Sequence, residues 1–397
     1  MNTTTINPWP ADLLQQARAL SAEMTAWRRD FHQHPEIGYE EVRTGNRVAE
    51  FCAAQGLAVR RMAGTGVVAT LNADKPGLAM ALRADLDALP VQEENGAIDY
   101  ASAMPGRAHL CGHDAHTAML MGAIRLLTAQ TAQIPRPVRF IFQPAEEILD
   151  GGAERLLREN VMDGVGEIYG LHIVPMLPTG TLGLRAGALM ASMNRVDITI
   201  EGKGGHAAYP HACLDPVLAG SEIVMALQSL VSRRVDPLAP AVLSITQFQA
   251  GSAFNIIPSR AQLAGTVRYL APELNSRMAR WIEEVVTGVA AAHGLTATVN
   301  YQYGTPVLVN DAKAAARLSS TFTDLGGAVC DVPPSMGGED FAYYLQKVPG
   351  AFAFLGAGDG TPATANGFHH PGFNIDERAM PWGAALLACI AMRRSPT

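Results

Sequence analysis

The sequence predicts an α/β protein with a largely parallel central sheet flanked by helices, into which a smaller ferredoxin-like α+β domain is inserted. Two observations support this. Short apolar runs alternate with helical patterns through roughly the first 189 residues, which is the order of a parallel sheet with crossover helices. From about residue 190 the order becomes strand, helix, strand, strand, helix, strand, which is the split ferredoxin-like unit.

The first part begins with helices. Residues 11–56 are expected to form two of them, separated at HQHPEIGYE, where Pro35 and Gly38 favour a turn. Three short apolar runs then have the length and character of buried strands. They are GLAMALRAD, RPVRFIFQPAEE and EIYGLHI. Between them, HTAMLMGAIRLLTAQ shows the pattern of a helix.

The second part starts with NRVDITIEG, where Val196, Ile198 and Ile200 alternate as in a half-buried strand. The expected elements that follow are the helix DPVLAGSEIVMALQSLVSRR, the strands AVLSITQFQ and SRAQLAGTVRYL, the helix APELNSRMARWIEEVVTGVAAAHG and the strand TATVNYQY. We therefore place an inserted domain at residues 190–303. Residues 1–189 and 304–397 would together form the larger domain.

Composition excludes several classes of protein. The net charge of -7 disfavours a nucleic-acid-binding surface, which needs a basic stripe. The N-terminus has neither a cationic region nor an apolar core, so we expect no signal peptide. The run GAALLACIAM is too short to cross a membrane. Five cysteines are few and odd in number, which favours reduced thiols in the cytoplasm.

One short segment is crowded with metal-binding side chains. HLCGHDAH, residues 109–116, contains three histidines, a cysteine and an aspartate. The three predicted strands also lead into polar residues: Asp85 and Asp87, Glu146 and Glu147, and His172. In open α/β sheets the functional crevice lies outside the carboxyl ends of the strands. We therefore expect these residues to gather at one edge, together with HLCGHDAH.

The donor types indicate the metal. Cys111 and His113 could bind one ion or two adjacent ions, and Glu147 and His172 add an oxygen and an imidazole. Such a mixed set suits Zn(II), Mn(II), Co(II) or Ni(II) better than Mg(II) or Ca(II). Neighbouring carboxylates are typical of two-metal sites, with the ions roughly 3.5 to 4 Å apart. If Glu147 binds metal, Glu146 is left to act as a base.

Long segments of the chain resemble the aminoacylase/carboxypeptidase superfamily of di-metal amidohydrolases. The branch is that of hippurate hydrolase, indole-acetyl-amino-acid hydrolase and N-acetyl-diaminopimelate deacetylase. The matching segments are RRDFHQHPEIGYEE, LRADLDALPVQE, HLCGHDAHTAMLMGA, FIFQPAEE, GLHI, EGKGGHAAYPH, FNIIPSRAQLAGTVR, MGGEDFAYY and HHPGFNID. The resemblance covers nearly the whole chain in the same order. It implies a catalytic domain and an inserted lid domain that forms a homodimer.

The resemblance also implies roles for single residues. Two divalent ions per subunit would be held by Cys111, His113, Glu147, His172 and a histidine of HHPGF. The position two residues before the proline favours His369 over His370 for that histidine. Glu146 matches the general base, and Asp87 matches an aspartate that steadies a ligand. Relatives outside this branch lack the cysteine and carry a histidine at the position of Asp85, whose role stays open.

Three residues of the inserted domain match family positions. His206 in GKGGHAAYPH matches a histidine that reaches the partner subunit's active site and stabilises the oxyanion. Asn255 and Arg268 resemble residues that contact the carboxylate end of the substrate, for which a guanidinium is suited. The resemblance thus implies hydrolysis of small N-acyl-L-amino acids, hippurate-like or N-acetylated, by a metal-bridging water.

Other interpretations remain at this level. Cys111 and His113 could be a buried thiol and a capping residue, Glu146 and Glu147 the start of a helix, and His206 part of a glycine-rich turn. A dipeptidase or metallocarboxypeptidase is the alternative enzyme. A catalytically inactive metal-binding protein is the alternative outside enzymes, although such a protein has no use for the spare base.

Overall fold

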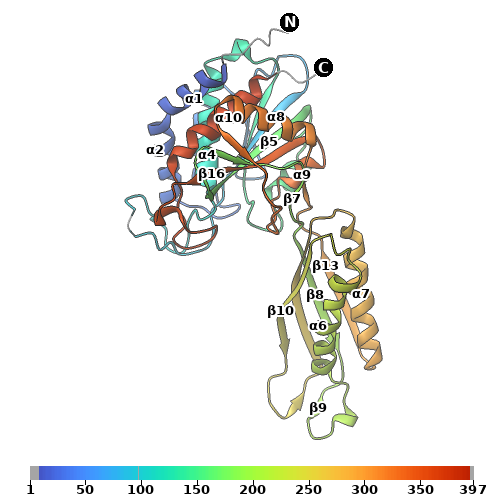
Figure 1. Cartoon of the computed structure of the whole chain (residues 1–397). Coiled ribbons are helices and arrows are strands. Elements are labelled where there is room, and N and C mark those ends of the chain that lie inside the picture. Colours follow the sequence, from blue (N-terminus) through green and yellow to red (C-terminus); the bar gives the residue numbers. More distant parts are fainter. Residues whose placement is uncertain (1–8, 97, 394–397) are drawn as a thin grey trace. The chain divides into compact units, whose positions relative to one another are not determined.

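The computed structural model of the chain describes residues 9–96 and 98–393 (Figure 1). It divides into two compact units. The larger unit comprises Met1–Gly187, Val309–Pro333 and Asp340–Thr397, and the smaller comprises Ala188–Leu308 and Pro334–Glu339. Residues 1–8, within the segment where we expect no signal peptide, lie outside the described residues.

The larger unit is built around an eight-stranded sheet with the order β1-β2-β4-β3-β5-β16-β6-β15. Four parallel strands form its centre: β4 (Val138–Gln143), β3 (Ala79–Asp85), β5 (Val165–Pro178) and β16 (Gly350–Gly358). The outer strands are β1 (Ala58–Met62), β2 (Gly66–Leu71), β6 (Thr181–Gly183) and β15 (Ala328–Cys330). The three apolar runs are therefore neighbouring parallel strands, and the predicted α/β fold with a largely parallel sheet is confirmed.

Helices that pack on one another cover one face of this sheet (Figure 1). They are α1 (Trp9–Ala19), α2 (Ser21–Gln33), α4 (His113–Thr128), α8 (Ala312–Asp324) and α10 (Met380–Met392). Helix α3 (Val42–Ala54) contacts β1 and β2, and the short helices α5 (Gly152–Arg158) and α9 (Ala342–Leu345) contact each other. Helices α4 and α10 are buried on nearly all sides, which explains their almost continuous apolar sequences.

The N-terminal region holds three helices rather than the two expected. The first predicted helix is interrupted at Leu20, whose N–H is shared between the carbonyls of Gln16 and Ala17. Such sharing tightens the last turn of α1 and ends it. Helix α2 then starts at Ser21, so this part of the prediction was wrong in number although right in type.

The smaller unit has its own sheet, helices and apolar core. Its main elements are β8 (Asn194–Glu201), α6 (Pro216–Arg233), β10 (Ala241–Ala250), β12 (Arg260–Tyr269), α7 (Leu274–Ala292) and β13 (Thr296–Gln302). They follow one another in the order that the sequence predicts. The strands form an antiparallel sheet with the order β10-β12-β8-β13. A small ribbon, β9 (Gly205–His206) with β11 (Ile256–Ile257), lies beyond one end of β8 and β12.

Among the described residues, no helix combines the length and apolar character needed to cross a membrane.

Candidate metal centre

The candidate centre lies at the carboxyl ends of β3 and β4 and beside the middle of the longer strand β5. Strand β3 ends at Asp85, and Asp87 follows in the next turn. Strand β4 ends at Gln143 and leads into Glu146 and Glu147. His172 lies on β5, beyond the last residue of β5 that pairs with β3.

Helix α4 begins at this edge with His113, and Gly112 precedes it in a left-handed conformation, φ 92°. A Cβ atom on Gly112 would lie 2.5 Å from Cγ2 of Ile173 on β5. Only glycine accommodates both the positive φ and this close approach. The glycine therefore allows the close packing on β5 of the segment that carries Cys111, before the helix, and His113, its first residue.

Hydrogen bonds define which nitrogen of His113 is available. Its Nδ1 lies 2.8 Å from the carbonyl oxygen of Asp87, which can only accept, so Nδ1 carries the proton. In the neutral ring Nε2 then holds a lone pair, and this atom is buried and has no hydrogen-bond partner among the described residues. It lies 3.8 Å from Oδ2 of Asp85 and 4.0 Å from Oε1 of Glu147. An orphaned, buried lone pair facing carboxylates is the arrangement that a cation would satisfy.

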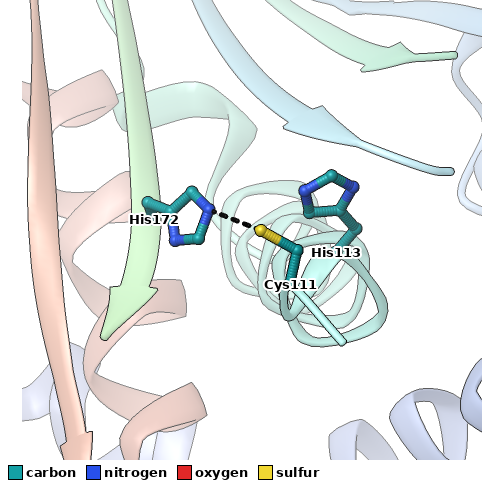
Figure 2. Close-up of side chains that lie close together, drawn as sticks. All are labelled: Cys111, His113 and His172. Atoms are coloured by element: carbon teal, nitrogen blue, oxygen red, sulfur yellow. Dashed lines mark hydrogen bonds between the residues drawn. The ribbon is translucent and has the colours of Figure 1, made fainter. Parts of the chain in front are cut away.

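His172 is oriented in the same way. Its Nδ1 donates to the carbonyl of Ile173 at 2.9 Å, so Nε2 presents a lone pair toward Sγ of Cys111 at 3.4 Å. Figure 2 shows the three side chains of Cys111, His113 and His172 converging. Burial and the neighbouring imidazole of His116 hold the pKa of His172 well below its usual range. The ring is therefore neutral, as a metal ligand must be.

The electrostatics around this cluster favour positive charge. Burial alone would lower the pKa of His113, but Asp85 and Asp87 outweigh it and raise that pKa well above its usual range. Carboxylates that stabilise a proton on the ring would equally stabilise a cation in its place. Burial and the charge of Glu147 raise the pKa of the Cys111 thiol, so a thiolate here requires a cation beside it.

The two glutamates follow a residue with a strained backbone. Ala145 has φ 53°, which is uncommon for a residue other than glycine. Its N–H donates to Oε1 of Glu41 at 2.8 Å, and its carbonyl accepts from Gly152 N at 2.9 Å. The N–H of Glu147 donates to Oδ2 of Asp87 at 3.0 Å. These contacts fix the direction in which the two glutamates leave β4.

The structure brings His369 to the cluster. Nε2 of His369 lies 3.1 Å from Oε1 of Glu147, and its backbone N–H donates to the carbonyl of Leu110. The neighbouring His370 is exposed, and its Nδ1 accepts from Gly372 N at 3.0 Å. Of the two histidines, His369, with φ 63°, is therefore the one whose side chain points toward Glu147.

The donors fit divalent cations. Three overlapping groups each have ligand atoms within 4.8 Å of one another: Cys111, His113 and His172; Cys111, Glu147 and His369; and His113, Glu146 and Glu147. Cys111, His113 and Glu147 each belong to two of these three groups, which suits a pair of adjacent ions. The mixture of thiolate, imidazole and carboxylate matches the borderline metals rather than Mg(II) or Ca(II).

His116 and Asp85 satisfy each other instead. Nε2 of His116 accepts from Ile173 N at 2.8 Å, so its Nδ1 donates to Oδ1 of Asp85 at 2.6 Å. The other oxygen of Asp85 accepts from Arg83 at 2.7 Å. Although His116 lies near other ligand-type side chains, it has no lone pair left for a metal. Asp85, whose role the sequence left open, thus orients the helix and strand that carry His113 and His172.

The predicted residues of the smaller unit do not form one group within it. His206 on β9 is exposed and pairs with Ile256, and the carbonyl of Asn255 accepts from Ala207 N. Arg268 lies near the opposite end of β12, opposite Val242 of β10. Eight strand positions separate Arg268 from Arg260, which corresponds to roughly 26 Å.

Sequence reasoning missed two buried groups that support the centre. Arg28 on α2 bonds Asp114, the neighbour of His113. Glu41 bonds Ala145, and burial raises the pKa of this carboxyl to about 7. Both belong to the segment RRDFHQHPEIGYEE. The available signal was an arginine on the face of α2 that also buries Met24 and Phe31.

Comparisons with known proteins show the family of the chain. The sequence profile of peptidase family M20/M25/M40 matches residues 81–393. The chain belongs to this family. The resemblance inferred from the sequence is therefore confirmed.

Individual proteins are similar to this chain over most of their length. An N-acetylcysteine deacetylase of Bacillus subtilis is 39% identical, over 94% of this chain and 97% of its own length. An N-acyl-L-amino acid amidohydrolase of Geobacillus stearothermophilus is 42% identical, over 73% of this chain and 79% of its own. A solved dinuclear metal-binding M20 peptidase of Bacillus subtilis is 36% identical, with a TM-score of 0.84 and coverage of 94% and 98%. Membership of this family supports divalent metal ions at the cluster.

If Cys111 is a ligand in this M20-family chain, metal should protect it from alkylation. We expect a variant that retains Cys111 as its only cysteine to react with iodoacetamide faster after chelation than when loaded with Zn(II). The reason is that a coordinated sulfur has its lone pairs engaged and its access blocked. Mass spectrometry of labelled peptides measures both rates, and equal rates would remove Cys111 from the ligand set.

Proposed function

We propose that this protein is a metal-dependent amidohydrolase that cleaves small N-acyl-L-amino acids into a carboxylic acid and an amino acid. The observation that carries the proposal is Glu146, a carboxylate beside a complete set of metal donors in a chain of the M20 family. The names of the two similar enzymes support the substrate class. Hippurate-like and N-acetylated amino acids are both within it.

We assign the metal ligands as Cys111, His113, Glu147, His172 and His369, on the geometry described above. Two divalent ions, Mn, Zn, Co or Ni, would lower the pKa of the attacking water and polarise the scissile carbonyl. Asp87 steadies the centre from both sides, because its carbonyl accepts from His113 and its carboxylate accepts from Glu147 N.

Glu146 is the residue that moves the proton. Its carboxylate takes a proton from the attacking water as the oxygen bonds to the carbonyl carbon. It then gives this proton to the amide nitrogen, so that the C–N bond breaks and the amine leaves neutral. Oε1 of Glu146 lies 3.4 Å from Asp340 N, a contact that keeps the carboxylate at the rim after the strained Ala145.

The smaller unit would serve as a lid that also forms a homodimer. His206 and Asn255 lie at the opposite end of the sheet from Arg268, so one lid cannot bring all three to one substrate without a large rearrangement. We assign His206 to the partner subunit's site, where it would stabilise the oxyanion. Arg268, half-buried and with a pKa lowered by burial, would bind the substrate's carboxylate.

The surface of the smaller unit supports pairing with a second copy. Strand β10 is an edge strand of ten residues, and most of its side chains are exposed. The neighbouring helix α6 exposes Leu218 (58%) and Met225 (73%). A long, exposed edge strand beside apolar side chains favours continuation of the sheet into a partner. We also propose a cytoplasmic location, which five free cysteines support.

The test is a substrate panel on metal-free protein reconstituted separately with Mn(II), Zn(II), Co(II) and Ni(II). Hippurate, N-acetyl-amino acids and dipeptides are compared by kcat/KM for each metal. We expect N-acyl-amino acids to be cleaved fastest. A preference for dipeptides would reassign the protein as a dipeptidase or metallocarboxypeptidase. Stoichiometric metal binding without hydrolysis of any substrate would make it a metal-binding protein only.

A further inference from the structure

Arg28 is a fully buried charge outside the donor set, and the mechanism above does not use it. It lies on the inner face of α2, with no exposed surface, next to Met24 and Phe31. A guanidinium is costly to remove from water, so a fully buried one needs partners for its donors. Its partners come from two segments that also carry proposed metal ligands.

The first segment is the start of α4. Nε of Arg28 donates to Oδ2 of Asp114 at 2.8 Å, and Asp114 directly follows His113. The same oxygen lies 2.7 Å from Nδ1 of His32, whose Nε2 lies 3.1 Å from Glu93. The ion pair is fully buried on both sides. The first turn of α4 is thereby fixed to α2 through a charged contact that excludes water.

The second segment follows His369. Nη2 of Arg28 donates to Oδ1 of Asn374 at 3.3 Å, and Nη1 donates to Oε1 of Glu377 at 3.2 Å. The guanidinium also stacks on Tyr100, 4.7 Å from the ring centre, and the hydroxyl of Tyr100 donates to the same oxygen of Asn374. One side chain thus bonds the neighbour of His113 and the loop that presents His369.

We propose that Arg28 is a positioning residue that sets the separation of the two ligand segments, 111–113 and 369, and thereby the affinity of the centre for its metal. This rests on the proposed metal site. The planar fork of arginine can reach Asp114, Asn374 and Glu377 at once, whereas the single ammonium of lysine cannot. The segments also make a backbone contact, from His369 N to Leu110 O, but that single bond involves neither Asp114 nor Asn374 and is independent of Arg28.

The chain offers a matched control in the adjacent Arg29. It donates to the same Glu377, at 2.8 and 3.0 Å, and stacks on the same Tyr100, but it is partly exposed and bonds neither Asp114 nor Asn374. Arg28→Lys and Arg29→Lys therefore both keep the charge and both disturb Glu377. Only Arg28→Lys removes the link between the ligand segments.

The experiment titrates metal-free wild type, Arg28→Lys, Arg29→Lys and Asn374→Ala with Co(II) against a competing chelator. Its readouts are affinity and the visible spectrum of the bound Co(II), and circular dichroism checks the fold. We expect Arg28→Lys and Asn374→Ala to bind Co(II) about 10- to 100-fold more weakly, the usual effect of losing a group that orients a ligand. Their spectra should differ from the wild-type spectrum, and Arg29→Lys should match wild type in both readouts.

Wild-type affinity and spectrum in Arg28→Lys, or an equal loss in Arg29→Lys, would overturn the positioning role. Should Arg28→Lys fail to fold, Asn374→Ala decides alone, because it removes one of the two bonds from Arg28 to the segment after His369 while leaving the buried Arg28–Asp114 pair intact. Hydrolysis by the wild type is measured in parallel. An active wild type with unaffected variants refutes this inference only, whereas a metal-binding but inactive wild type refutes only the proposed function.

Discussion

Glu146→Gln is expected to lower kcat by about 10²- to 10⁴-fold while leaving the metal content of the protein near the wild-type value. Glutamine has nearly the same size and keeps an oxygen that can accept from Asp340 N, but it cannot take a proton from water. Single-substrate kinetics and elemental analysis of the purified variant measure the two quantities.

Glu147→Gln is the matched control for this result. Glu147 neighbours His369 at 3.1 Å and is assigned as a ligand, so its substitution should first weaken metal binding. The activity of Glu147→Gln should partly return at high metal concentration. The activity of Glu146→Gln should stay low at every metal concentration. Loss of bound metal in Glu146→Gln would show that Glu146 is itself a ligand and that the base lies elsewhere.

A mixed dimer of His206→Ala and Glu146→Gln is expected to regain activity although each variant alone is inactive. If His206 serves the partner subunit, the mixed dimer contains one site with both groups intact. The recovered rate should approach about half that of the wild-type dimer if the two sites act independently. The measurement is a titration of one purified variant against the other, with subunit exchange verified by native mass spectrometry.

The control mixes Glu146→Gln with Cys111→Ala. Both changes fall in the larger unit, where each would damage only its own subunit's site, so both sites of that mixed dimer stay defective and no activity should return. Absence of recovery in the His206 mixture, despite proven exchange, would assign His206 to its own chain or to a structural turn.

The sequence was sufficient to predict that the strand ends meet at one edge of the sheet and which types of metal donor lie there. Parallel strands deliver their carboxyl ends to one edge, so recognising three apolar runs was enough to bring Asp87, Glu147 and His172 together. The histidine of the C-terminal loop was predictable only through family resemblance. This histidine, His369, reaches Glu147 because its backbone is in the left-handed conformation. Nothing in the sequence HHPGF predicts that conformation.

What escaped prediction is the set of buried polar partners. Arg28 bonds Asp114 and Glu377, 86 and 349 positions away in the chain, and no periodicity links positions so far apart. His116 looks like a second imidazole ligand in HLCGHDAH, beside His113. Only the direction of its two hydrogen bonds, to Asp85 and from Ile173, shows that its ring is already engaged. Tautomers and long-range ion pairs are properties of the folded chain.

The donors that converge at the sheet edge lie far apart in the chain, from Cys111 before α4 to His369 after β16. A bound ion would therefore act as a cross-link that closes a very long loop, in addition to any role in chemistry. The unfolded chain has no such preformed site, so binding and folding are thermodynamically linked. At a free metal concentration a hundredfold above Kd, this linkage adds about 2.7 kcal/mol to the free energy of unfolding. The melting temperature would then rise with the concentration of free metal. A low metal concentration would reduce the amount of folded enzyme as well as its turnover.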